Sequence, residues 1–307
     1  MSNNLKEIPL SLPYEITIPR PLMYPIVDWG LLEVRGPDAE KFLQGQVTCD
    51  VRQLLEKGYL DGAFCNPKGR VLATFRLIST GNTICLRMPT DLISHIQTVL
   101  QKYAAFFDVQ LHHKHETRGL FLESNAPIDV IQDDPLFASV IKESSAEFWG
   151  SKEQIETMQR KYQNQYSPAA ADWWRFMLIK TQTAQIFEAT REQFLAHQLS
   201  LDLTGAISFR KGCYTGQEII ARTQYRGKSK KRLASLRLEG SQYLAPGTEI
   251  FSLEKKPLGH VLLGVSDSQS TLLQAVLPED VAKSGRVILG SENTAYEIAF
   301  GPMSEKQ

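Results

Sequence analysis

The sequence has no excess of charge of either sign and no long apolar run. It contains 34 Lys and Arg residues against 34 Asp and Glu residues, so its formal net charge at pH 7 is zero. Dedicated nucleic-acid-binding domains are usually basic overall, and this balance argues against one. No stretch approaches the roughly 20 apolar residues that a membrane-spanning helix needs. We therefore expect neither a membrane protein nor a general nucleic-acid-binding protein.

Cysteine is scarce, with four residues in 307. Cys49, Cys65, Cys85 and Cys213 are spaced neither like a CxxC metal site nor like a disulfide framework, so reduced thiols and no tightly bound metal are expected. The N-terminal 21 residues contain prolines and charges where a signal peptide needs an apolar run. These features predict a cytoplasmic location.

Strand and helix patterns are mixed over the first 200 residues without regular βαβ alternation, which favours the α+β class. We expect strands at 29–34, 60–65, 70–78 and 84–88, and helices at 91–103 and 172–180. Beyond residue 232, short strands separated by Gly, Pro, Ser and Asp predict a small β-barrel or sandwich. The predicted parts are an extended arm at 1–21, two lobes within 22–205, a motif segment with its helix at 206–232, and a barrel at 233–307.

Three helix starts carry local signals. Ser151 with Gln154, and Thr215 with Glu218, have the spacing of a capping box. Ser167-Pro168 has the pattern of an N-cap followed by proline in the first helical turn. We expect a helix to begin at each of these places.

Residues 205–232 carry the clearest signal for chemistry. Cys213 lies just before the helix expected near Gly216, and a helix N-terminus offers free N–H groups and partial positive charge. Arg210 and Lys211 precede it, and all three features favour the thiolate if the sulfur is partly exposed. Gly212 and Gly216 allow a sharp turn or close approach to a ligand. The alternative, a small buried hydrophobic side chain, stays open for Cys213.

The same segment is strongly basic, with Glu218 as its only acidic residue. Its eight basic residues are Arg210, Lys211, Arg222, Arg226, Lys228, Lys230, Lys231 and Arg232. Such a run is either a solvated face or a site for phosphate or several carboxylates, which pair with Arg and Lys by charge-assisted hydrogen bonds. Because the whole chain is neutral, a local anion clamp is preferred to general nucleic-acid affinity.

The run KGCYTGQE at 211–218 resembles the hallmark motif of the folate-binding YgfZ family, relatives of the glycine-cleavage T-protein (aminomethyltransferase). Supporting resemblances cover roughly residues 22–300 and include Trp29 with the block at 36–51, the turn Asn66-Pro67-Lys68-Gly69-Arg70, and Arg222 with Arg226-Gly227. The motif and anion-binding candidates are Lys211, Gly212, Tyr214, Gly216, Gln217, Glu218, Arg222 and Arg226.

The resemblance implies a T-protein-like three-lobed fold, with two intertwined α+β lobes around a central folate-binding cavity and a C-terminal β-barrel. It implies that Cys213 is the functional cysteine, and that Trp29 and Trp174 flank a folate such as tetrahydrofolate or a derivative. It also implies a role in assembly or repair of iron–sulfur enzymes, including radical enzymes that thiomethylate tRNA. One cysteine cannot hold a cluster alone, so any transient cluster would be shared with a partner.

The chain departs from its relatives after the tryptophan helix, where they commonly have Glu-Ala-Gly. Here Lys180, Thr181 and Gln182 match that run, and a lysine cannot accept hydrogen bonds from the pterin's N–H groups. Either another acceptor, Glu188 or Asp202, replaces the glutamate, or folate binding is weak or altered.

Two other activities are considered. A tetrahydrofolate-dependent aminomethyltransferase would need a carboxylate where this chain has Ala73 and Thr74, so that activity is not favoured. An RNA-contacting module would use the basic residues between Arg222 and Arg232 and would bind in a salt-dependent manner. Direct RNA binding is kept as the less favoured alternative.

Overall fold

The computed structural model describes residues 21–80, 83–128, 138–227, 229–279, 281, 286–290 and 295–297. Apart from its last residue, the predicted arm at 1–21 lies outside these ranges. The chain divides into two compact units that interleave along the sequence. The first consists of Met1–Gln44, Val51–Asp61 and Phe75–Trp174, and the second of Gly45–Asp50, Gly62–Thr74 and Arg175–Gln307. The boundaries predicted at 205 and 232 both fall inside the second unit and stay predictions.

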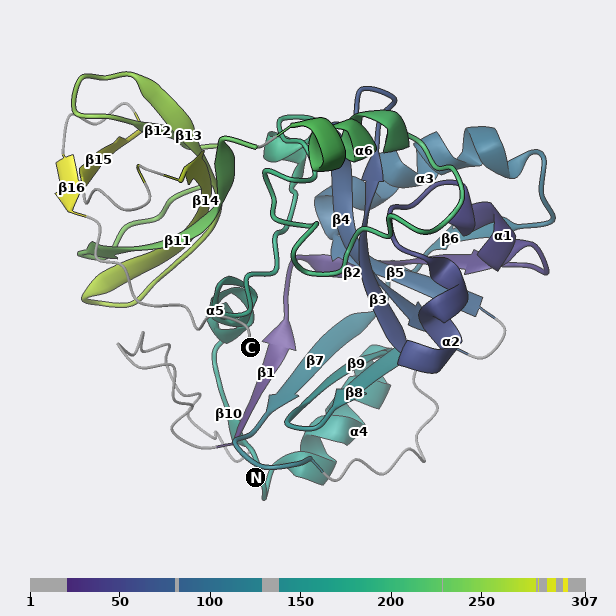
Figure 1. The fold of residues 1–307 in the computed structure, drawn as a ribbon. Coiled ribbons are helices and arrows are strands. Elements are labelled where there is room, and N and C mark those ends of the chain that lie inside the picture. The colour runs from purple at the N-terminus through teal and green to yellow at the C-terminus, as the bar shows by residue number, and fades with distance from the viewer. Residues whose placement is uncertain are drawn as a thin grey trace. The chain divides into compact units, whose positions relative to one another are not determined.

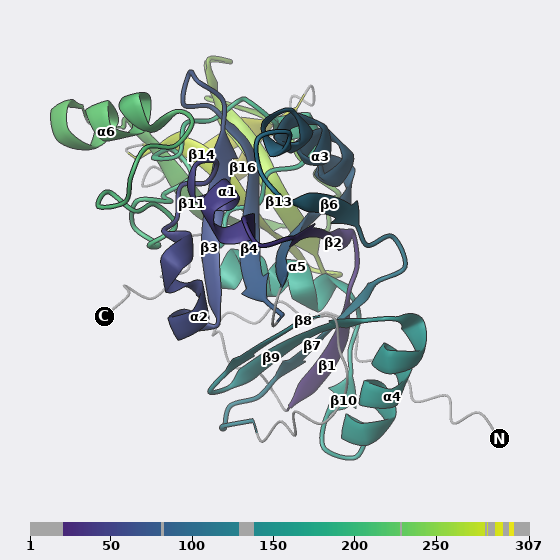
Figure 2. The ribbon, with the colours of Figure 1, turned by 90° about the vertical axis from the view of Figure 1, so that its right-hand side faces the viewer.

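A five-stranded sheet in the first unit has the order β10-β1-β7-β9-β8. Its strands are β10 (Ser167–Pro168), β1 (Leu22–Ile26), β7 (Arg118–Glu123), β9 (Ser145–Gly150) and β8 (Ala138–Lys142). Helix α4 (Lys152–Tyr162) packs on β7 and β9 (Figure 2). Its predicted capping box is confirmed, because Ser151 Oγ accepts from Gln154 N and Gln154 Oε1 accepts from Ser151 N.

The second five-stranded sheet has the order β3-β4-β5-β2-β6. Its strands are β3 (Tyr59–Cys65), β4 (Val71–Ser79), β5 (Thr83–Pro89), β2 (Trp29–Arg35) and β6 (Gln110–His113). Helix α3 (Thr90–Ala104) packs on β2, β5 and β6 through its buried leucines and isoleucines. The shorter helices are α1 (Ala39–Gln44), η1 (Val51–Gln53) and α2 (Leu54–Lys57). The strands predicted at 29–34, 60–65, 70–78 and 84–88 are therefore confirmed as β2, β3, β4 and β5.

The third sheet lies in the second unit and has the order β11-β14-β13-β12-β15-β16 (Figure 1). Its strands are β11 (Lys231–Glu239), β14 (Ser270–Pro278), β13 (Pro257–Ser266), β12 (Glu249–Phe251), β15 (Arg286–Leu289) and β16 (Ala295–Glu297). Contacts between the edge strands β11 and β16 show that the sheet curls back on itself as a half-barrel. Its inner side is a core of leucine, isoleucine and valine side chains. The predicted C-terminal barrel is thus a curled, antiparallel sheet.

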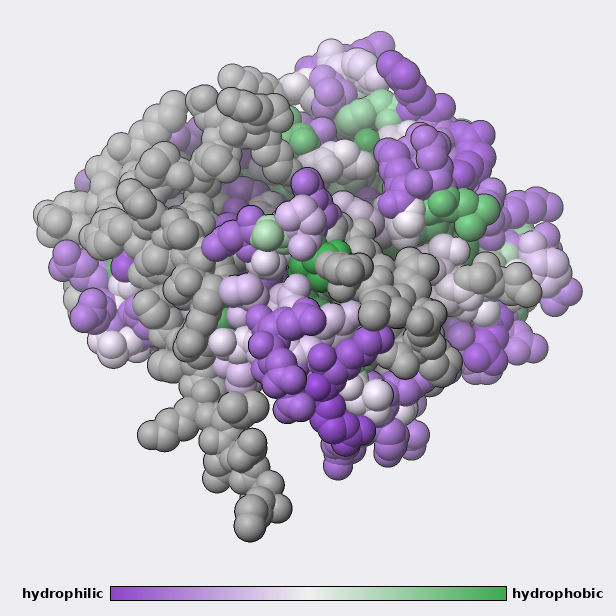
Figure 3. All heavy atoms as spheres, turned by 90° about the horizontal axis from the view of Figure 1, so that it is seen from below, coloured by the Kyte–Doolittle hydropathy of each residue, from purple (hydrophilic) through white to green (hydrophobic). Residues whose placement is uncertain are grey.

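Three more helices complete the described structure: α5 (Asp172–Lys180), η2 (Glu188–Thr190) and α6 (Gln217–Arg226). Almost all strand pairs are antiparallel, and β1 with β10 is the parallel pair in the described part of the chain. The class is α+β, as predicted from the missing βαβ alternation. On the face drawn in Figure 3, small groups of hydrophobic residues stand between hydrophilic ones, the usual mixture on a protein surface.

One predicted helix start and one predicted capping box are wrong. Ser167-Pro168 forms the short strand β10 because Ser167 N donates to the carbonyl of Pro21 and Ala169 N donates to that of Met23. These pairings are with a distant segment, and they override the local signal for a cap. Helix α6 does exist, but its N-cap is Gly216, which makes no side-chain capping bond.

Candidate functional site

Lys211 anchors the motif loop, the segment 206–216 that precedes α6. The Nζ atom of Lys211 is buried and donates to the carbonyl oxygens of Val47 at 2.6 Å and Cys49 at 2.7 Å. Between them, Thr48 Oγ1 donates to the carbonyl of Ala206 at 2.7 Å. These bonds tie Ala206 and Lys211 to the segment 47–49. Lys211 was predicted as an anion-binding residue, but its ammonium group serves the fold instead.

The beginning of α6 packs backbone to backbone against the turn at 66–69. Gly216 has φ of +84°, and a Cβ atom there would lie 2.6 Å from the carbonyl oxygen of Asn66 and 3.0 Å from Cys65 Cβ. A Cβ atom on Gly69 would lie 2.8 Å from Ile219 Cβ. Sterics therefore explain why residue 216 is a glycine. Gly212 has no such constraint, because a Cβ atom there would meet nothing within 4 Å.

Cys213 differs from the other three cysteines in its exposure. It is exposed, whereas Cys49, Cys65 and Cys85 are buried. Burial raises the pKa of the Cys65 thiol to about 12. Burial, with the nearby carboxylate of Glu33, raises the pKa of Cys85 to about 12 as well. The motif cysteine is thus the thiol that a partner can reach, which is the condition that a reactive role requires.

The basic segment divides into structural and free side chains. Arg232 Nη1 donates to Asp202 Oδ1 at 2.6 Å and to the carbonyl of His197 at 2.8 Å, so Arg232 joins Lys211 in holding the fold. Four of the other basic side chains are exposed: Arg210, Arg222, Arg226 and Lys230. Lys228 lies outside the described residues. The motif neighbours Gln217 and Glu218 are half-buried and exposed, respectively.

The structure brings Trp29 and Trp174 together in the first unit. Their ring centroids are 5.8 Å apart with the planes at 87°, and Phe121 lies 5.3 Å from Trp174. Both tryptophans are nearly sealed, with 4% and 2% of their surface exposed. The guanidinium carbon of Arg87 lies 5.1 Å from the Trp174 ring centroid, within the range of a cation–π contact.

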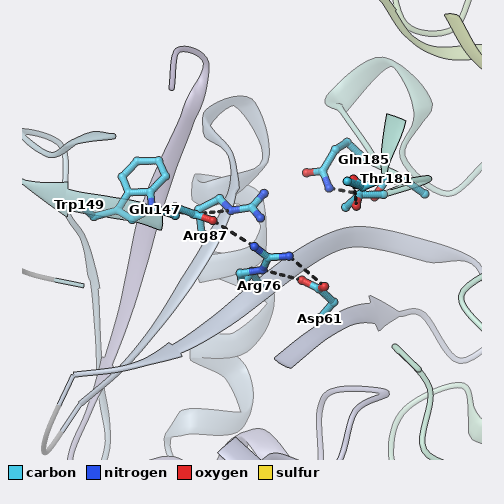
Figure 4. Close-up of polar contacts among 9 residues, drawn as sticks. Asp61, Arg76, Arg87, Glu147, Trp149, Thr181 and Gln185 are labelled. Carbon is cyan, nitrogen blue, oxygen red and sulfur yellow. Dashed lines mark hydrogen bonds and ion pairs between the residues drawn. The ribbon is translucent and has the colours of Figure 1, made fainter. Parts of the chain in front are cut away.

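A buried ion network supports this aromatic cluster. Glu147 accepts hydrogen bonds from Arg76 Nη1 and from Arg87 Nε, each at 3.1 Å (Figure 4). Trp149 Nε1 donates to the same carboxylate at 2.7 Å, and Arg76 also forms a two-bond pair with Asp61. Burial opposes ionisation of Glu147, yet the two arginines hold its pKa below the ordinary value.

Within this network, Arg87 retains an unused donor. Arg76 on β4 stands directly opposite Arg87 on β5, a like-charge pair that is unfavourable in a sheet unless an anion bridges it. Glu147 is that bridge, but Arg87 Nη1 and Trp174 Nε1 are buried with no hydrogen-bond partner among the described residues. Unpaired buried donors are costly, and they indicate a place where a ligand or water supplies an acceptor.

The sequence of this chain is similar to those of several bacterial proteins. The chain is 30% identical over 295 residues to the "tRNA-modifying protein YgfZ" of Hamiltonella defensa, covering 89% of this chain and 88% of the relative. It is 31% identical over 295 residues to the protein of that name from Colwellia psychrerythraea, covering 88% and 89%. This chain belongs to the YgfZ family. No family model matches the chain.

A solved structure agrees in fold with this YgfZ family member. It is the glycine cleavage system aminomethyltransferase T from Bartonella henselae, with a TM-score of 0.70, 13% sequence identity, and coverage of 93% of this chain and 86% of that one. The predicted T-protein-like fold is therefore confirmed. In the described ranges, no helix has the length and apolar character needed to cross a bilayer. No group of three or more His, Cys, Asp or Glu side chains within those ranges is placed to hold a metal ion.

The departures from the YgfZ family pattern have structural consequences. Gln182, where the resemblance predicts a glycine, has φ of +53°, and its Nε2 donates to Ser235 Oγ at 2.8 Å. Neither carboxylate offered as a substitute for the missing glutamate is free: Glu188 is paired with Arg191, and Asp202 with Arg232.

Sequence reasoning missed Arg87 and its network. The available signal was an arginine inside each of two otherwise apolar strands, VLATFRLIS and TICLRMP. Such residues are rarely buried without a partner. The partner, Glu147, lies 60 residues beyond Arg87 in sequence, so local patterns do not reveal it.

Proposed function

We propose that this protein is a folate-binding accessory factor for the assembly or repair of iron–sulfur enzymes, including radical enzymes that thiomethylate tRNA. Its proposed place of action is the cytoplasm, where tRNA and reduced thiols coexist. The observation that carries the proposal is the exposed sulfur of Cys213 on a loop whose neighbours, Lys211 and Tyr214, are buried. The names of the relatives, which call them tRNA-modifying, support the link to tRNA.

Folate fits the chemistry around Trp29 and Trp174 in part. A pterin is a flat heterocycle with a carbonyl oxygen and ring nitrogens that accept hydrogen bonds, and aromatic side chains suit such rings. Arg87 Nη1 and Trp174 Nε1 are buried donors that an acceptor of this kind would satisfy. The bound cofactor would supply a one-carbon carrier. We therefore assign Arg87 Nη1, a donor, to the acceptor edge of the heterocycle.

Cys213 is proposed to act as a thiolate ligand to iron, together with ligands of a client enzyme. One thiolate does not hold a cluster alone, so the client completes the coordination. Ligation requires only that the thiol lose its proton, and no oxidant or reductant is needed. The exposed position of Cys213 suits an encounter with another protein.

An aminomethyltransferase reaction is not supported. Ala73 and Thr74 occupy the places where the T-protein resemblance puts its aspartates, and both are buried. Thr74 Oγ1 accepts a hydrogen bond from Ile186 N at 3.1 Å, so its hydroxyl is part of the fold. Neither side chain supplies a carboxylate for proton transfer.

Complementation in a bacterial strain that lacks this protein tests the proposal. Wild-type protein is expected to restore thiomethylated nucleosides in tRNA, measured by mass spectrometry, and Cys213→Ser is expected to fail while folding normally. Cys85→Ala, which removes a buried thiol, is the control and should restore them. Full restoration by Cys213→Ser would rule out the thiol role.

A further inference from the structure

One face of α6 presents an aromatic ring between two arginines. Arg222, Tyr225 and Arg226 are spaced i, i+3 and i+4, so they share one side of the helix. All three are exposed, and Tyr225 has 72% of its surface in solvent. The opposite side of α6 carries the buried Ile220. The Tyr225 ring therefore stands in solvent between two charged side chains of the same helix face.

The Tyr225 ring is braced rather than loose. Phe209 lies 6.2 Å from it with the ring planes at 70°, and Phe209 in turn lies 6.4 Å from the buried His197. His197 Nε2 is 3.1 Å from Oε1 of Gln224, the residue before Tyr225, which fixes this turn of the helix. A ring that is already held in place loses little conformational entropy when a ligand stacks on it.

Arg222 and Arg226 flank the ring on the same helix face, and the exposed Glu218 lies one turn before Arg222. Arg210 follows Phe209 directly and is exposed, so the Phe209–Tyr225 contact brings a third arginine to the same neighbourhood. Among the described residues, the side chains of Arg210, Arg222 and Arg226 form no ion pair. The chain as a whole has no net charge, and this concentration of free arginine is therefore local.

We propose that Arg210, Arg222, Tyr225 and Arg226, the α6 platform, bind a single-stranded segment of RNA. An unpaired base stacks on Tyr225, and the arginines contact the flanking phosphates. An exposed aromatic ring among basic side chains is the arrangement with which proteins bind single strands. A duplex is not expected to fit, because its bases are already stacked on one another. An acidic protein would use the arginines but would leave the Tyr225 ring without a role.

This inference rests on the tRNA-related role proposed above, yet its test needs neither folate nor a client enzyme. The probe is a fluorescein-labelled single-stranded RNA of roughly twelve nucleotides, a length within the usual site size. Fluorescence anisotropy with the full chain measures its affinity. Failure to bind would overturn the platform and would leave the Cys213 complementation result unaffected, so the two proposals fail separately.

Tyr225→Ala is expected to weaken RNA binding about tenfold, because one base–aromatic stack is lost. Tyr225→Phe keeps the ring and should retain the affinity. The matched control is Tyr243→Ala, which removes a tyrosine that is 86% exposed in the second unit. Equal losses for Tyr225→Ala and Tyr243→Ala would overturn the proposal, as would wild-type binding of a paired hairpin as tight as that of the single strand.

The double variant Arg222→Gln/Arg226→Gln tests the phosphate contacts. Its plot of log affinity against log salt should be shallower than that of the wild type by about 1.4, since each single-strand phosphate contact contributes about 0.7. Lys57→Gln/Lys102→Gln removes two exposed charges elsewhere and should leave the slope unchanged. An unchanged slope in the arginine variant, or competition by polyglutamate as effective as competition by RNA, would overturn the proposal in favour of an acidic protein partner.

Discussion

The motif segment at 211–226 and the aromatic cluster around Trp174 differ in how their candidate functional groups meet solvent: Cys213 is exposed, whereas Trp174 is buried. In the motif segment, Lys211 is bonded to two backbone carbonyls and Gly216 packs on a turn, so these residues anchor the segment. Cys213 is exposed to solvent. The cluster is almost sealed, yet it keeps buried donors without partners on Arg87 and Trp174. The proposed role of the first region therefore rests on the exposure of Cys213, and that of the second on buried donors without partners.

The largest expected effect is a difference in the free energy of unfolding between alanine variants of the two motif glycines. Gly216→Ala should lower the free energy of unfolding by about 3 kcal/mol, because a left-handed backbone and a clash with the Asn66 carbonyl both oppose a Cβ atom. Gly212→Ala meets open space and should change it by less than about 0.5 kcal/mol. Urea denaturation measures both. Similar losses would contradict the division of the motif into an anchored and an open side.

A smaller effect concerns the two arginines on Glu147. Arg87→Lys should weaken binding of a reduced folate about tenfold, the loss of one charge-assisted hydrogen bond. Arg76→Lys also breaks a bond to Glu147, but Arg76 is paired with Asp61 and should leave the affinity unchanged. Quenching of tryptophan fluorescence, with circular dichroism as the check of folding, gives both constants. Equal weakening would mean that the network only supports the fold.

The smallest effect lies at Gln182, where the chain departs from its family. Gln182→Gly relieves the left-handed backbone but loses the bond to Ser235, so the free energy of unfolding should change by less than about 0.5 kcal/mol. Gln182→Ala keeps the strain and loses the bond, and should cost about 1 kcal/mol. Thermal unfolding of the two variants distinguishes them. The reverse order would show that the left-handed backbone at residue 182 carries no strain that a glycine relieves.

Local signals in the sequence predicted much of the fold. Apolar periodicity located α3, and the Ser151–Gln154 capping box located α4, because these elements are decided by neighbouring residues. Ser167-Pro168 was predicted incorrectly because its hydrogen bonds go to a strand about 145 residues earlier, at Met23.

The candidate site was predictable to a lesser degree. The motif, Cys213 and the two tryptophans carry sequence signals, but the burial of Lys211 does not, since the carbonyls that it binds belong to residues 47–49. The pairing of Arg76 with Arg87 across two strands depends on register and on a carboxylate from another sheet. Such long-range contacts are invisible to spacing rules.

The account depends most on Cys213 being the accessible thiol, and alkylation of the native protein tests this directly. At pH 8, iodoacetamide followed by peptide mass spectrometry should label Cys213 and leave Cys65 and Cys85 unmodified, because burial raises the pKa of each of these two thiols to about 12. All four cysteines should react after denaturation. Native labelling confined to Cys213 is the predicted result, whereas an unreactive Cys213, or labelling of Cys65 or Cys85 in the folded chain, would contradict it.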